Sequence, residues 1–149
     1  MPEIVHAAMA LPSDPLRFRE ARRWAFQVAL QAGLDRAEAN AVAVALAESC
    51  ANVHRHAYSG RRDGPIELAI DASEGRVVTT VRHRGVPFDT GAYVPPDLGH
   101  PAEGGYGMYL IAKLVDDVSF VAGPEGGTIV LVKRRRAEVN AALEEWGTR

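Results

Sequence analysis

Two long stretches in the N-terminal half repeat their apolar residues with helical spacing, and typical helix signals bound each of them. The first begins at Ser13-Asp14-Pro15, where a capping side chain precedes a proline whose missing N–H costs little, and it ends at Gly33. Asp35 opens the second, which extends from about Ala37 to Tyr58. The stripe of apolar residues predicted to be buried on the first helix comprises Leu16, Phe18, Trp24, Ala25, Val28, Ala29 and Leu30.

Alternating apolar and polar residues, which indicate half-buried strands, recur in the rest of the chain. An opening strand is expected over residues 3–11. The run IELAIDASEGRVVTTVRHRG predicts an antiparallel hairpin that turns at Ser73-Glu74-Gly75. The other predicted elements are strands near 118–121 and 128–133, helices at 108–115 and 137–146, and a long loop rich in Gly and Pro over 87–107.

This order of elements predicts an α+β fold, a two-layer sandwich in which helices cover one face of a mixed, mostly antiparallel sheet. The chain has 149 residues, of which 47% are hydrophobic and 24% charged, and this is ordinary globular composition. That length is enough for one well-cored domain. We therefore expect residues 1–149 to form a single domain.

Charge and cysteine content narrow the choice of partners and compartment. There are 17 Lys and Arg against 19 Asp and Glu, so the net charge of -2 does not favour binding to nucleic acid or to an anionic membrane. Cys50 is the only cysteine, which rules out an internal disulfide. The start of the chain lacks the pattern of a signal peptide, and no run approaches the ~18 apolar residues of a membrane span. A cytoplasmic protein is expected.

One carboxylate and one amide stand out on the second helix, within ALAESCANVHRHAY. Glu48 and Asn52 are four residues apart and therefore neighbours on one face, which they share with alanines and Arg55. A solvent-facing helix would carry long polar side chains there, whereas alanines allow something to approach the backbone closely. The alternative is a helix buried on both sides, with Glu48 and Asn52 hydrogen-bonded to each other or to a loop.

The segment EGGYGMYLIAKLVDDV combines glycines with the start of an apolar helix. Gly104, Gly105 and Gly107 approach this helix, and backbone N–H groups with the positive end of a helix dipole favour an anion such as phosphate. No G-K-[ST] follows, so the segment is not a Walker motif, and the preceding loop does not fit a dinucleotide fingerprint. The alternative is a flexible loop capped by glycines.

The segment VRHRGVPFD ends a predicted strand at Gly85. A glycine at such a turn often allows the backbone to approach a planar ligand closely. This segment alone is a weak signal, but it lies between the Glu48–Asn52 helix and the glycine-rich helix start. The order of the segments is therefore more informative than any one of them.

The ordered set resembles the ATP-binding domain of the GHKL superfamily, which includes gyrase, heat-shock chaperone ATPases, histidine kinases and mismatch-repair ATPases. Within it, the chain is most similar to small bacterial serine kinases that act as anti-sigma factors. ALAESCANVHRHAY is similar to their N box, VRHRGVPFD and GGYGMYLIAKLVDDV to their two glycine boxes, and GGTIVLVKR to their closing strands. The resemblance implies a Bergerat-type fold. It also implies an ATP- and Mg²⁺-dependent serine/threonine kinase that binds a sigma factor and phosphorylates a small antagonist protein, with homodimers common.

The resemblance also implies roles for individual residues. Glu48 would be the general base, and Asn52 would place its side-chain oxygen on Mg²⁺. Gly105 and Gly107 would hold phosphate oxygens, and Thr128 would reach the adenine directly or through water. The loop from 90 to 103 would form a mobile lid, and His56 matches the N-box histidine, for which a structural role is equally open.

His83 departs from the family pattern. The pattern has an aspartate there, which accepts a hydrogen bond from the adenine amino group, and a histidine can accept one only as the neutral ring. Losing a charge-assisted bond costs on the order of 1 to 2 kcal/mol, or about tenfold in affinity. We expect weakened ATP binding. Two alternatives stay open: a protein-binding module that has lost useful catalysis, and an ATP-binding partner of a response-regulator phosphatase.

Other candidate residues have simpler interpretations. Cys50 and His54 are four apart, but Cys50 falls on the apolar side and is expected to be a small buried hydrophobe. His54 and His56 point to different faces, and the five histidines show no zinc spacing. The arginines at the start of the first helix lie where the resembling kinases dock sigma factor and antagonist; they are Arg17, Arg19, Arg22 and Arg23.

Overall fold

A computed structural model describes residues 5–73, 75–88 and 106–136. Within these residues, the sheet has five strands. The strands occur in the order β1-β2-β3-β5-β4, and all four pairings are antiparallel. The expected mostly antiparallel sheet is confirmed, and its described part contains no parallel pair. The strand bounds are β1 Val5–Pro12, β2 Pro65–Ser73, β3 Arg76–His83, β4 Asp117–Gly123 and β5 Gly126–Arg134.

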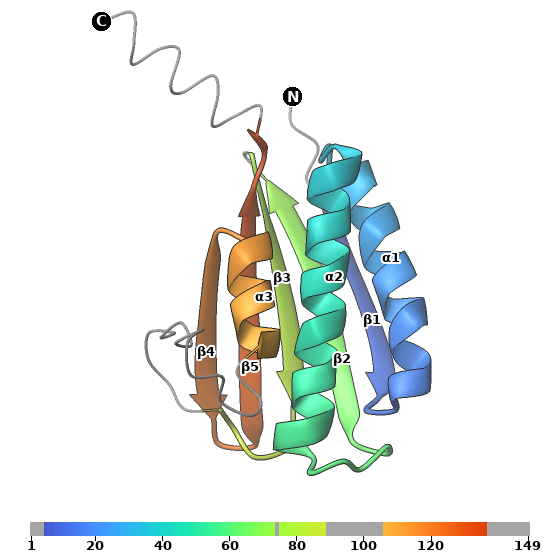
Figure 1. The fold of residues 1–149 in the computed structure, drawn as a ribbon, viewed down its shortest axis with the longest axis vertical. Helices are drawn as coiled ribbons and strands as arrows, with labels where there is room; N and C mark the ends of the chain where they lie inside the picture. Colours follow the sequence, from blue (N-terminus) through green and yellow to red (C-terminus); the bar gives the residue numbers. More distant parts are fainter. Residues whose placement is uncertain (1–4, 74, 89–105, 137–149) are drawn as a thin grey trace, which may run out of the picture.

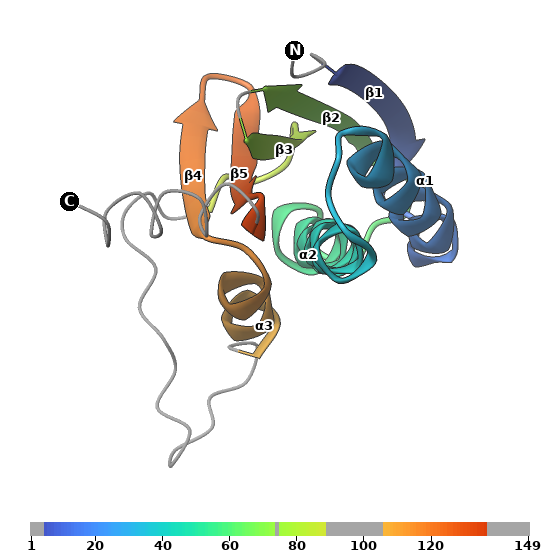
Figure 2. The same ribbon diagram turned by 90° about the horizontal axis from the view of Figure 1, so that it is seen from above.

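Three α-helices cover one face of this sheet, so the predicted two-layer α+β sandwich is confirmed (Figures 1 and 2). Their bounds are α1 Phe18–Gln31, α2 Arg36–Asn52 and α3 Tyr106–Leu114. A 3-10 turn, Pro15–Arg17, leads into α1, and a π-helical turn, Val53–Ala57, extends α2. None of the helices in the described ranges is long and apolar enough to cross a bilayer. The predicted helix at 137–146 and the predicted lid at 90–103 lie outside the described residues.

The helix boundaries follow the signals in the sequence. The Asp14 carboxylate accepts a hydrogen bond from the backbone N–H of Leu16, and Gly33 ends the first helical segment with a φ of 94°, which favours glycine. Asp35 and Glu38 form a reciprocal capping box at the start of α2, with N–O distances of 2.7 and 2.9 Å. These bonds satisfy backbone donors that would otherwise be unpaired at the helix ends.

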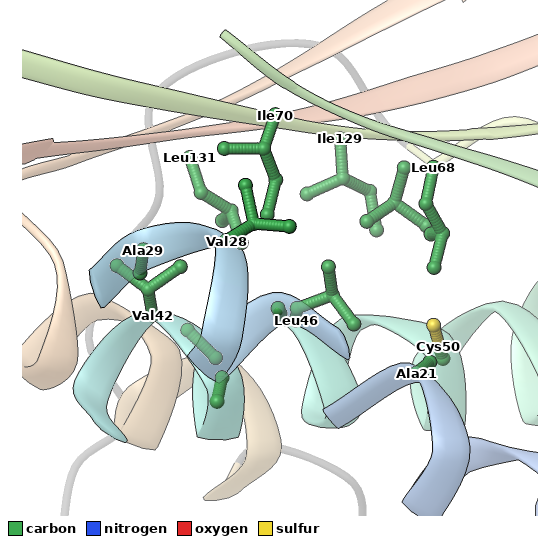
Figure 3. Packing of buried hydrophobic residues seen from close by; sticks show 14 of the residues in the cluster. Ala21, Val28, Ala29, Val42, Leu46, Cys50, Leu68, Ile70, Ile129 and Leu131 are labelled. Carbon is green, nitrogen blue, oxygen red and sulfur yellow. The ribbon is translucent and has the colours of Figure 1, made fainter. Parts of the chain in front are cut away.

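The core lies between the sheet and the helices, and α2 is at its centre. Ile70, Ile129 and Leu131 point from the sheet toward Val42 and Leu46 of α2 (Figure 3). Helix α2 also packs against α1 and α3, so buried residues occur around nearly its whole circumference. Alanine and cysteine fill the narrow contacts with its neighbours; they are Ala39, Ala43, Ala45 and Cys50.

The predicted apolar stripe of α1 is mostly confirmed, but Leu16 is an exception. Phe18, Ala25, Val28 and Ala29 are buried, whereas the side chain of Leu16 is 79% exposed. Leu16 lies in the 3-10 turn before α1, where the spacing of three residues per turn does not continue the helical stripe. Ala21, which the sequence prediction omitted, is fully buried instead.

Replacement of Leu46 by alanine should lower the free energy of unfolding by about 2 to 5 kcal/mol, because the side chain is fully buried and its removal leaves a cavity at the centre of the core. Urea denaturation would measure the change. Leu16→Ala is the matched control and should change stability by less than about 0.5 kcal/mol. Equal effects of the two substitutions would contradict this account of the core.

Candidate functional site

Asn52 lies at the C-terminal end of α2, and its side chain is 1% exposed. The side-chain N–H group donates to the sulfur of Met108 in α3, at 3.2 Å. The side-chain oxygen accepts a hydrogen bond of 2.9 Å from the guanidinium of Arg55. Because a guanidinium can only donate, this bond fixes the direction of the amide. Asn52 bonds Met108 and Arg55 rather than Glu48, so the interpretation in which Glu48 and Asn52 bond each other does not hold.

The contact between Asn52 and Met108 brings the first turn of α3 to the end of α2. Gly107 immediately precedes Met108 in this first turn. Glu48 is half-buried, one helical turn before Asn52 on the same side of α2. The structure therefore places Glu48 and Asn52 together on α2, and Met108 links Asn52 to the turn of α3 that contains Gly107. Gly105 lies outside the described residues.

The end of α2 also holds the turn that contains Gly85. In the π-helical turn, the N–H of Tyr58 donates to the carbonyl of Val53 at 3.0 Å, and the N–H of Val86 donates to the carbonyl of Ala57 at 2.9 Å. A Cβ atom on Gly85 would lie only 2.3 Å from that carbonyl oxygen. The close approach expected at Gly85 thus exists, but it is made to the backbone of Ala57.

His83 ends β3 and is buried, with 2% of its side chain exposed. Within the described ranges, neither ring nitrogen has a hydrogen-bond partner. The rings of Tyr58 and Phe88 lie edge-on to it, with centroid distances of 6.2 and 5.6 Å. Burial lowers the pKa of His83 below its ordinary value of 6.5, because the charged ring is disfavoured away from water. The ring is therefore neutral near pH 7, the form in which it can accept a hydrogen bond.

Aromatic side chains close the space in front of His83. Phe88 packs against His83 and also lies 5.5 Å from Phe120 of β4 and 6.3 Å from His56, measured between ring centroids. On the neighbouring strand, Gly127 lies directly opposite His83, and a Cβ atom there would be 3.1 Å from Nε2 of His83. A ligand that reaches the nitrogens of His83 must therefore displace Phe88 or a neighbour.

Thr128 does not share a face with His83. Side chains alternate along β5, and Thr128 pairs with Arg82 and Val121, whose exposed side chains lie on the sheet face away from the helices. The residue of β5 that faces the helices beside His83 is Gly127. The register of β3 and β5 therefore directs the two side chains to opposite faces, although both residues line one pocket at this end of the sheet. A contact of Thr128 with adenine stays a prediction.

The surroundings of Cys50 and His54 indicate structural roles for both residues. Cys50 is fully buried in the core, and burial raises the pKa of its thiol to about 12, so it is not a nucleophile at neutral pH. His54 bonds through Nδ1 to the backbone carbonyls of Ser13 and Arg61, at 2.8 and 3.2 Å. The Nδ1–H group donates to both carbonyls, and these bonds tie the end of α2 to two loops.

Two residues of the site were missed in the sequence interpretation as functional groups, namely Arg55 and Phe88. Arg55 is three residues after Asn52, and this spacing makes two side chains neighbours on a helix. The contact between them could therefore have been predicted from the sequence. No pattern in the sequence predicts the position of Phe88, because its packing against Phe120 of β4 depends on the order of the strands in the sheet.

A metal ion would find one suitable protein ligand here. In the described part of the chain, no group of three or more His, Cys, Asp or Glu side chains is placed to hold a metal. The buried oxygen of Asn52 suits a hard cation such as Mg²⁺, which often takes only one or two protein ligands and completes its shell with water and phosphate oxygens.

A second feature is a groove between α1 and α2. It has a volume of about 670 Å³, and its lining includes Arg19, Arg22, Arg23 and Arg36 together with Phe26. The guanidinium of Arg36 lies over the ring of Phe26, at 5.6 Å. This groove is basic although the chain carries a net charge of -2.

Comparison with known proteins agrees with this geometry. The family model of the histidine kinase-like ATPase domain matches residues 11–133, and the chain belongs to this family. The serine-protein kinase RsbW of Oceanobacillus iheyensis is 27% identical over 145 residues, which cover 92% of this chain and 90% of that protein. RsbW of Bacillus subtilis is 28% identical over 138 residues, which cover 87% and 86% of the two chains.

A solved structure shows the same fold. The crystal structure of the RsbU and RsbW domains of Rv1364c from Mycobacterium tuberculosis matches with a TM-score of 0.63 and 20% sequence identity. The match covers 87% of this chain and 32% of the longer mycobacterial chain. The expected Bergerat-type fold and the resemblance to anti-sigma-factor kinases are both confirmed at the level of family.

The buried neutral His83 should make stability depend on pH. As pH falls below 6.5, the unfolded chain takes up a proton at this position before the folded protein does, so the free energy of unfolding should decrease. One such group contributes a slope of at most about 1.4 kcal/mol per pH unit. Urea denaturation between pH 7.5 and pH 5 would compare the wild type with His83→Phe, which keeps an aromatic ring without nitrogens.

All other titrating groups are common to these two proteins, so the difference between their slopes isolates His83. His83→Phe should lose less stability on acidification than the wild type. Identical slopes would mean that the His83 ring is hydrated or charged in the folded protein.

Proposed function

We propose that this protein is an ATP-dependent serine/threonine kinase of the anti-sigma-factor type, which binds a sigma factor and phosphorylates a small antagonist protein. The observation that supports this most is the placement of Glu48 and Asn52 on one side of α2, against the first turn of α3. Relatives named serine-protein kinase RsbW match along most of their length. A general base, an amide ligand and a helix N-terminus are the parts that phosphoryl transfer needs.

In the proposed reaction, Glu48 accepts the proton of the acceptor hydroxyl as that oxygen bonds to the terminal phosphorus of ATP. The bond from this phosphorus to the bridging oxygen breaks, and ADP leaves with the electron pair. N–H groups of the first turn of α3 would bond phosphate oxygens. Mg²⁺, when bound through the oxygen of Asn52, would neutralise part of the phosphate charge. Glycines that include Gly105 and Gly107 would allow the phosphates to approach the backbone.

An alternative proposal is a protein-binding module of the same fold with little or no catalysis. It is favoured by the replacement of an acceptor carboxylate by His83 and by the aromatic side chains that cover this ring. It is opposed by the presence of Glu48 and Asn52, which such a module would not need. The two proposals differ in whether the protein binds ATP with useful affinity.

For protein partners, we propose that the basic groove between α1 and α2 is the docking surface. Arg19, Arg22 and Arg23 point into one groove, and its charge complements an acidic segment of a sigma factor or an antagonist. Leu16, exposed at the start of α1, adds an apolar contact next to this groove. A cytoplasmic location and a homodimer are parts of the same proposal.

Calorimetric titration with ATP should show binding that depends on Mg²⁺ and is weakened at least tenfold in Asn52→Ala, because the amide oxygen is the proposed protein ligand. His83→Asp should bind ATP about tenfold more tightly, because a carboxylate accepts a stronger hydrogen bond from the adenine amino group. Asn40→Ala, an exposed position on the same helix, is the control. No binding by the wild type at millimolar ATP would favour the alternative module.

Glu48→Gln should bind ATP about as tightly as the wild type but transfer phosphate about 10² to 10⁴ times more slowly, because the amide cannot accept the proton. Transfer from labelled ATP to the antagonist protein, or to water, would be followed. Glu67→Gln, at an exposed position of β2, is the control. Unchanged transfer in Glu48→Gln would exclude Glu48 as the base.

A further inference from the structure

The basic groove between α1 and α2 carries positive charge that the described carboxylates do not offset. Its arginines are all exposed; they are Arg19, Arg22, Arg23 and Arg36. No described carboxylate lies within ion-pair distance of any of them, whereas Arg17, just before α1, pairs with Glu20 at 2.9 Å. Phe26 and two alanines, Ala37 and Ala43, also line the groove. The complementary ligand is therefore an acidic segment that carries apolar side chains.

The last described residues lie beside this groove. The guanidinium of Arg135 donates to the carbonyl of Ala32, at the end of α1, at 2.7 Å. The backbone N–H of Arg136 donates to the carboxylate of Glu38, in the first turn of α2. Arg36, which lines the groove, is two residues before Glu38. The described chain therefore ends next to the groove, on the helical side of the sheet.

The sequence that follows, AEVNAALEEWGTR, has the properties that this groove favours. Its carboxylates outnumber its single arginine; they are Glu138, Glu144 and Glu145. Its apolar residues include a set with the spacing of one helical face, namely Val139, Ala142, Leu143 and Trp146. In a helix, Glu138 and Glu145 would lie together on the flank of this face, because they are seven residues apart. The sequence therefore predicts an acidic, amphipathic segment.

This segment has the length to lie along the groove. A helix rises about 1.5 Å per residue, so residues 137–146 would span about 15 Å. The part of α2 that lines the groove extends from Arg36 to Ala43, which is about 10 Å. Because the segment is tethered to the molecule that carries the groove, its effective concentration there is on the order of millimolar, and a weak contact is enough to hold it.

We propose that residues 137–149 dock in the groove between α1 and α2 of the same molecule, with their carboxylates on its arginines and their apolar face on Phe26. This contact needs neither nucleotide nor kinase activity. Because the groove is also the docking surface proposed for protein partners, the segment would compete with an acidic segment of a partner for the same arginines. Docking would then be autoinhibitory until a partner displaces the segment.

The first test follows the exposure of Trp146 in the full-length protein. Trp24 is the only other tryptophan, so Trp24→Phe leaves Trp146 as the single reporter. Acrylamide quenching of its fluorescence should show a shielded ring. Raising the salt concentration to about 1 M, where the Debye length falls to about 3 Å, should expose it. Quenching as efficient as that of free tryptophan at low salt would overturn the proposal.

Groove variants in the Trp24→Phe background assign the shielding to the arginines. Arg22→Gln with Arg36→Gln should raise the quenching constant about twofold or more, because two charge-assisted contacts are lost. The matched control is Arg62→Gln with Arg82→Gln, which removes the same charge at exposed positions away from the groove and should leave quenching unchanged. Equal quenching in the groove variant and the control would mean that Trp146 is shielded elsewhere, and would overturn the proposal.

Cross-linking distinguishes docking within one molecule from docking on a second copy. Arg22→Lys with Arg36→Lys gives the groove amines, which a carbodiimide couples to carboxylates in direct contact. Protein labelled with ¹⁵N is mixed in equal amounts with unlabelled protein, equilibrated and cross-linked. Links from Glu138, Glu144 or Glu145 to the groove should join peptides of the same isotope only. Mixed-isotope pairs would assign the groove to the segment of a second copy, and the absence of such links would exclude docking; either result would overturn the proposal.

Discussion

The burial of α2 on nearly all sides determines how the rest of the molecule can be arranged. The sheet covers one side of this helix through Ile70, Ile129 and Leu131, while α1 and α3 cover others. A helix in this position can carry polar groups only where they have partners, because an unpaired buried polar group costs on the order of 1–3 kcal/mol. Asn52 meets that condition through Arg55 and Met108. The same contacts bring the start of α3 to the proposed phosphate site.

The proposed phosphate-binding end of the site and its proposed adenine-binding end differ in how well they suit a nucleotide. At the proposed phosphate end, Glu48 and Asn52 lie on one side of α2, and the Asn52 amide already bonds Arg55 and the sulfur of Met108 in α3. At the base end, the nitrogens of His83 are buried without described partners beneath Phe88 and beside Gly127. A nucleobase bound there, as proposed, would exchange this aromatic packing for its own contacts.

The basic groove belongs to the outer side of the helical layer and is independent of the core. Phe18, Ala25 and Val28 fix α1 against the molecule, while its arginines extend away from the sheet. Several like charges on one helix repel each other and contribute little to folding, since exposed ion pairs are worth at most about 1 kcal/mol each. These arginines are concentrated at a groove that Phe26 also lines. Recognition of a partner, the role proposed for this groove, explains their concentration better.

The sequence by itself determined the helices, strands and most of their boundaries, because capping side chains, glycines at turns and the period of apolar residues act locally. Asp14, Asp35 and Gly33 are examples in which the local signal matched the structure. It also placed Glu48 and Asn52 on one side of a helix, since their spacing fixes this. The register of β3 and β5 was not determined locally, and it separated Thr128 from His83 and put Gly127 in its place. The closure of Phe88 over His83 likewise depended on the order of the strands, because these contacts join segments that are distant in the sequence.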